Sequence, residues 1–223
     1  MAAGFVPATV ALCAPLEPGA VPDGRRGPAA GITWVARLDV LTAGGPWQGV
    51  DLALEIDPAW LDSRQALRDA LRASRVAVPG LDAAVLRGAF LRHHDLLAAA
   101  GIRVVLVDAF GDVRRGSRRP APAGWACRNV AWGLWEVRHE PPRGHRPWSW
   151  LWPTGSLPAP RRGGLHVLSA ADGRGRWGSQ VGLWNAWVAR HAARITVVPI
   201  AALPDLFEGG RCGSLGGSVL RAA

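Results

Sequence analysis

Short apolar segments recur along the chain and alternate with helix-like segments, so the fold must combine strands and helices. The clearest segment is Arg103–Phe110, RVVLVDAF, whose run of branched residues predicts a buried strand. Val50–Ile56 alternates as VDLALEI, which is typical of a strand with one buried face. Because such segments occur in both halves of the chain, we expect an α+β fold.

The other predicted elements follow from the same patterns. Further strands are expected at Phe5–Cys13, Ile32–Leu41, Arg128–His139, Trp148–Trp152, Leu165–Ser169, Arg194–Ile200 and Ser218–Ala222. A helix is predicted from Asp57-Pro58 to about Ser74, because Asp caps a helix and Pro fits its first turn. Two more helices are predicted at Leu81–Ala100 and Trp177–Ala193, and a short turn at Ala202–Phe207.

The composition changes at Gly111–Gly124, GDVRRGSRRPAPAG, which is rich in arginine and ends in Pro, Ala and Gly. Such a segment indicates a linker or a long basic loop. We therefore predict two domains, residues 1–115 and 125–223, joined by a basic linker at 116–124.

The chain is strongly basic, with 26 Arg and Lys residues against 17 Asp and Glu and a formal net charge of +9. All of the cations are arginine, which remains charged, binds phosphate in a fork geometry and stacks on bases. GC-rich coding DNA explains why arginine replaces lysine, but not the excess of cations over anions. The charge predicts a nucleic-acid partner.

Arginines also gather locally. Arg64, Arg68 and Arg72 are spaced as a stripe along the first predicted helix, which is either a face for RNA or an ordinary solvated face. The other candidate RNA-binding arginines lie in predicted loops: Arg25, Arg26, Arg114, Arg115, Arg118, Arg119, Arg161 and Arg162.

Several classes of protein are not expected. The three cysteines, Cys13, Cys127 and Cys212, have no disulfide or metal-ligand spacing. No apolar run reaches the roughly 18 residues needed to span a bilayer, and the first residues do not resemble a secretory signal. We therefore expect a cytoplasmic protein without metal, cofactor or membrane contact.

A glycine-rich segment lies near the C-terminus, after an apolar strand and a short helix. Its residues are Gly209, Gly210, Arg211, Gly213, Ser214, Gly216 and Gly217. Glycines let backbone N–H groups approach an anion, although the same segment could be a simple hairpin loop.

This arrangement resembles the C-terminal glycine-rich loop of the RAMP superfamily of CRISPR-associated proteins, and most resembles its repeat-processing endoribonucleases. Leu86–Phe90, LRGAF, is similar to a short run in some members. The resemblance implies two ferredoxin-like domains that bind a CRISPR repeat hairpin in RNA. It also implies one metal-independent cut that leaves a 2′,3′-cyclic phosphate, retention of the product, and a place in a ribonucleoprotein complex used in antiviral defence.

Such a cut requires a base near the attacking 2′-hydroxyl, an acid near the leaving oxygen and cations around the phosphorus. Family members usually carry a catalytic histidine early in the first domain, whereas the first histidine here is His93. His93 falls on an apolar helix face, so the catalytic candidates are His94 and Arg37. Two alternatives remain open: a non-catalytic scaffold subunit that holds crRNA, and a basic phage or plasmid structural protein that faces nucleic acid.

Overall fold

The computed structural model describes residues 7–16, 18, 31–87, 91–108, 127–139, 164–169 and 177–208. Within these residues nine strands form one sheet, in the order β6-β7-β5-β4-β3-β2-β1-β8, with β9 also paired to β1. The strands are β1 Ala8–Pro15, β2 Ile32–Ala36, β3 Leu52–Ile56, β4 Ala83–Leu86, β5 Val104–Asp108, β6 Cys127–Ala131, β7 Leu134–His139, β8 Leu165–Ser169 and β9 Ile195–Val197.

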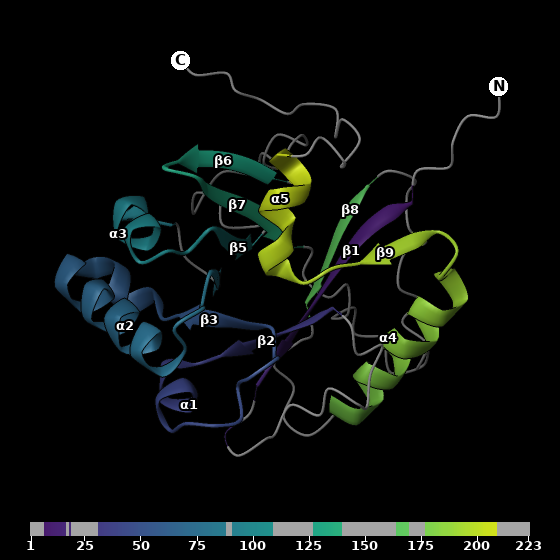
Figure 1. The fold of residues 1–223 in the computed structure, drawn as a ribbon, viewed down its shortest axis with the longest axis horizontal. Helices are drawn as coiled ribbons and strands as arrows, with labels where there is room; N and C mark the ends of the chain where they lie inside the picture. Colours follow the sequence, from purple (N-terminus) through teal and green to yellow (C-terminus); the bar gives the residue numbers. More distant parts are fainter. Residues whose placement is uncertain are drawn as a thin grey trace, which may run out of the picture.

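The helical segments follow the strands along the chain. They are α1 Leu38–Thr42, η1 Pro58–Asp62, α2 Arg64–Ala77, α3 His94–Ala99, α4 Trp177–His191, η3 Ile200–Ala202 and α5 Leu203–Glu208. All strand pairs are parallel except β6 with β7. Helices α1, α2 and α3 lie at the left of the sheet in Figure 1 and α4 lies at the right.

The sheet curls on itself, because β7 and β8, at opposite ends of the parallel run, come close to each other. Alternate residues therefore face an enclosed apolar interior or the surrounding helices. Val35, Ala53, Val85 and Leu106 belong to the interior cluster, which also includes Ala11, Cys13, Ala83, Val104, Val137 and Val167.

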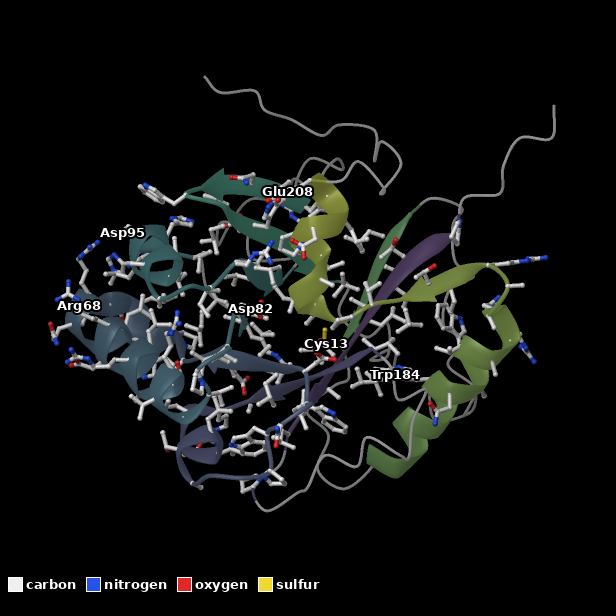
Figure 2. All side chains as sticks on the ribbon, in the orientation of Figure 1. Cys13, Arg68, Asp82, Asp95, Trp184 and Glu208 are labelled. Carbon is white, nitrogen blue, oxygen red and sulfur yellow. The ribbon has the colours of Figure 1, made fainter. Side chains whose placement is uncertain are left out.

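The outer face of the sheet is covered in two places. Leu54, Ile56 and Leu86 pack with Leu67 and Leu71 of α2. Val10, Leu12 and Leu168 pack with Trp184 and Trp187 of α4, and Figure 2 shows Trp184 between that helix and the sheet. Both faces of the parallel strands are thus buried, which explains their nearly continuous apolar sequences.

The amino end of the curled sheet is closed by η3 and α5. Ile200 and Leu203 are fully buried in the interior cluster, and the Phe207 ring lies 5.0 Å from the Trp135 ring, centroid to centroid. Arg103, just before β5, donates a hydrogen bond to Asp205 of α5.

The mixed composition of strands and helices is confirmed, but two ferredoxin-like domains are not. Ferredoxin-like domains are built on antiparallel sheets, whereas strands from both predicted halves share one mostly parallel sheet here. The predicted linker at 116–124 and the predicted strands Trp148–Trp152 and Ser218–Ala222 lie outside the described residues.

Several predicted elements are wrong in part: Arg128–His139 is the hairpin of β6 and β7 rather than one strand, and Arg194–Ile200 is a strand only at Ile195–Val197. Leu81–Ala100 is not one helix: it contains β4, and α3 begins only after His93 in a left-handed conformation at φ 58°. The run Ala83–Leu86 is buried on both faces, so it lacks the alternation by which strands are recognised. Ile32–Leu41 is a strand only to Ala36, after which extended Arg37 begins α1.

The helix predicted from Asp57 to Ser74 is divided in two. The Asp57 Oδ1 atom accepts a 2.9 Å hydrogen bond from the Ala59 N–H and caps η1 as expected. Ser63 then adopts an extended conformation and caps α2 by accepting from the Ala66 N–H. Helical spacing predicts that Leu67, Ala70, Leu71 and Ser74 lie on one side of this helix, and these residues are its buried face.

Burial raises the pKa of the Asp82 carboxyl at the amino end of β4, and the positive charge of Arg103 opposes this shift. The folded chain therefore holds this proton more tightly than the unfolded chain, so the stability contribution of Asp82 falls as pH rises above about 4. We expect Asp82→Asn to raise the free energy of unfolding at pH 7 and to lose this advantage at pH 3, as measured by urea denaturation. Exposed Asp62→Asn is the matched control, and an equal gain in both variants would contradict the prediction.

Candidate ligand site at the carboxyl ends of the strands

A pocket of about 560 Å³ lies where β2, β3 and β4 end. Its volume is within the range of about 300–1,000 Å³ that is usual for small-molecule sites. Ligands of parallel sheets bind outside the carboxyl ends of the strands, which is where this pocket lies. The lining residues are Arg37, Leu38, Asp39, Thr42, Glu55, Ile56, Asp57, Pro58, Trp60 and Arg87.

Strand alternation places the two central charged residues of this pocket. Glu55 comes two residues after Ala53, and Arg87 comes two residues after Val85; both of these apolar residues belong to the interior cluster. The register pairs Glu55 with Val85 on the neighbouring strand, so Arg87 lies just beyond it. Each charged residue therefore continues an interior-facing row at the end of its strand.

Glu55 and Arg87 form an ion pair across the two strands, with 3.9 Å between Arg87 Nε and Glu55 Oε1. Their side chains are only 27% and 22% exposed, so the pair is partly shielded from water and its charges interact more strongly than on an open surface. Burial raises the pKa of the Cys13 thiol, and the charge of Arg87 opposes this shift. The buried Cys13 therefore remains a protonated thiol.

The rim of the pocket is more open. Arg37 Nη2 lies 3.1 Å from Asp39 Oδ2, and both side chains are more than half exposed. Such an exposed pair contributes little to stability. Trp60 is half-buried and forms one wall of the pocket. It also packs against the outer core cluster, the apolar cluster that joins β3 and β4 to α2.

Of the two predicted catalytic residues, Arg37 lines the pocket and His94 does not. The His94 Nε2 atom lies 3.4 Å from Glu136 Oε1, and Glu136 is buried on β7. His94 thus links α3 to the sheet. The structure does not bring these two residues into one site.

The three arginines of the α2 stripe are all exposed, and two of them have partners within the protein. Arg64 forms an ion pair with Asp95 of α3, and this hydrogen bond lowers the pKa of Asp95. Arg68 donates to the Gln65 side chain, and Arg72 is exposed. Figure 2 shows Arg68 and Asp95 at the outer edge of the molecule and Cys13 near its centre.

The remaining predicted RNA-binding residues lie outside the described residues. They are Arg25, Arg26, Arg114, Arg115, Arg118, Arg119, Arg161, Arg162, Gly209, Gly210, Arg211, Gly213, Ser214, Gly216 and Gly217.

Sequence reasoning missed Glu55, Asp57, Trp60 and Arg87 as site residues. The sequence did contain a signal for Glu55. Burying an acidic residue near the end of an apolar strand costs free energy, so such a residue usually has a partner or a function. Arg87 was assigned to a helix, which concealed its position at a strand end.

Searches against protein-family models, curated proteins and solved structures find no match to this chain. Among the described residues, no helix has the length and apolar character needed to cross a membrane. The same residues contain no group of three or more His, Cys, Asp and Glu side chains suited to a metal ion. The fold and the pocket define the class: a mostly parallel α/β protein with a ligand-sized site at its strand ends.

Proposed function

We propose that the protein is an enzyme that acts on a small polar molecule in the strand-end pocket, with Glu55 as its acid–base group. The observation that carries this proposal is the partly shielded Glu55–Arg87 ion pair, which lies in a 560 Å³ pocket at the carboxyl ends of parallel strands. A partly desolvated charge pair costs stability unless its partners compensate it, so its presence in a pocket favours a functional role.

Each member of the pair has a distinct role in this proposal. The Glu55 carboxylate accepts a proton from a bound hydroxyl or water, which is the usual work of a general base. Arg87 positions that carboxylate across the strands at 3.9 Å and offers guanidinium donors to the same ligand. Arg87 is therefore a positioning residue as well as a binding residue.

The test is a thermal-shift screen with neutral sugars, sugar phosphates, amino acids, dicarboxylates and nucleotides. At least one probe is expected to raise the melting temperature of the wild type and to be converted during incubation, as followed by proton NMR. Glu55→Gln should abolish conversion, and Arg87→Ala should weaken binding at least about tenfold, equivalent to 1.4 kcal/mol. Asp69→Asn and Arg72→Ala, on exposed α2 positions, are the matched controls. Absence of any shift, or a shift that both pocket variants retain, would reject this function.

RNA processing is a second candidate, favoured by the excess of 26 cationic over 17 acidic residues and by the resemblance of the glycine-rich segment to the repeat-processing endoribonucleases. A non-catalytic version of this candidate is a scaffold subunit that holds crRNA together with other ribonucleoprotein subunits. The remaining alternative is a basic phage or plasmid structural protein that faces nucleic acid. Under this candidate the protein would be cytoplasmic. Its support is the charge and the glycine-rich segment rather than the fold, since two ferredoxin-like domains are not confirmed. A repeat-hairpin RNA in the same screen tests it: salt-sensitive binding that Glu55→Gln leaves unchanged would favour this candidate over the pocket enzyme.

A further inference from the structure

The described residues that line the pocket differ in charge balance from the whole chain. They include two arginines, Arg37 and Arg87, and three carboxylates, Asp39, Asp57 and Glu55. Each arginine forms an ion pair with a carboxylate of the same pocket. A phosphate or carboxylate ligand would therefore have to compete with carboxylates already in place, and would meet like charges around it.

The polar groups of the pocket are of both kinds. Carboxylate oxygens accept hydrogen bonds, guanidinium groups donate them, and the Thr42 hydroxyl can do either. A hydroxyl group of a ligand can donate to a carboxylate while it accepts from an arginine. A ligand with hydroxyls on successive carbons can therefore use these mixed pairs without adding charge.

One wall of the pocket is apolar. Trp60 is held there by packing against the outer core cluster, beside Leu38, Ile56 and Pro58. A rigid aromatic wall is a large contact surface with little conformational entropy to lose, and it suits a flat, partly apolar ligand face. The C–H face of a sugar ring has this character, while its edge carries the hydroxyls.

We propose that the ligand of this pocket is a neutral carbohydrate, with one ring face packed on Trp60 and its hydroxyls bonded to the Glu55–Arg87 pair. This inference rests on the proposed function, because it assigns the substrate class of the same site. Asp57 and Arg37 at the rim contact the remaining hydroxyls.

The experiment is isothermal titration calorimetry of the full chain with glucose, N-acetylglucosamine, cellohexaose and chitohexaose as neutral probes. Glucose 6-phosphate and glucuronate are the anionic counterparts of glucose, with the same ring configuration. We expect at least one neutral sugar to bind and its charged counterpart to bind at least about tenfold more weakly, or 1.4 kcal/mol. A hexasaccharide that binds more tightly than its monosaccharide identifies a polymer as the source, and the reverse order identifies a free sugar.

Three tryptophan variants test the stacking contact. Trp60→Ala should weaken binding of the neutral sugar about tenfold or more, whereas Trp60→Phe keeps a ring and should retain most of the affinity and the fold. Trp132→Ala removes a tryptophan that is 71% exposed on the β6–β7 turn and should leave binding unchanged. Equal weakening by Trp60→Ala and Trp132→Ala would overturn the assignment.

The two proposals fail in different ways. Binding of an anionic or non-sugar probe that depends on Glu55, without binding of any neutral sugar, would overturn the carbohydrate and leave the enzyme proposal standing. Absence of any probe whose binding depends on Glu55 or Arg87 would overturn both. Because the comparison of neutral with charged sugars uses the wild type, it holds even if Trp60→Ala does not fold.

Discussion

Replacing Leu106 with alanine is expected to lower the free energy of unfolding by about 3 kcal/mol, within the usual range of roughly 2–5 kcal/mol for buried Leu→Ala changes. Leu106 is fully buried on β5, in the middle of the interior cluster. Its strand neighbours are Val85 on β4 and Val137 on β7, so the cavity would open where three parallel strands meet. Strands on all sides constrain the backbone, which limits relaxation into the cavity.

The measurement is urea denaturation of the wild type and the variant, with an unchanged slope as the sign of an unaltered transition. Val76→Ala is the control, because Val76 is 79% exposed on α2 and its loss should change stability by no more than about 0.5 kcal/mol. A Leu106→Ala variant no less stable than Val76→Ala would show that the interior is not packed as described.

Thr33→Val is expected to lower the free energy of unfolding by about 1–3 kcal/mol, although the two side chains have nearly the same shape. The Thr33 Oγ1 atom accepts a 2.9 Å hydrogen bond from the Ile200 N–H, and both residues are buried. Valine removes the acceptor and leaves the N–H without a partner in an apolar interior, which costs its full desolvation. This hydrogen bond joins η3 to β2. Its loss should therefore loosen the packing of η3 and α5 over the amino end of the sheet.

The check combines urea denaturation with amide hydrogen exchange at Ile200. Thr33→Ser keeps the hydroxyl and should retain both the slow exchange and most of the stability lost by valine. If Thr33→Val exchanges as slowly as the wild type and unfolds at the same urea concentration, the hydrogen bond does not hold this segment.

Local sequence patterns predicted several elements well. The alternation in Val50–Ile56 and the apolar runs Arg103–Phe110 and Leu165–Ser169 correspond to β3, β5 and β8. The buried face of α2 was also predicted, because its apolar residues recur at helical spacing. Leu81–Ala100 failed because a strand buried on both faces has the same apolar run as a buried helix.

The site was predicted only in part. Arg37 was selected for its charge and does line the pocket, while His94 was selected for its chemistry and instead pairs with Glu136. Glu55 and Arg87 are 32 positions apart, and nothing in their local sequences indicates that they meet. Their ion pair depends on the parallel pairing of β3 with β4.

The sequence by itself determined the local features of this protein: the cap at Asp57, the buried stripe of α2, and the positions of the clearest strands. These features depend on residues a few positions apart, whose backbone hydrogen bonds and apolar spacing are set within one element. Only the tertiary structure decided that the strands pair in parallel and curl, and that the carboxyl ends of β2, β3 and β4 share one pocket. The physical reason is that strand order and register depend on packing between distant segments, which no local pattern encodes.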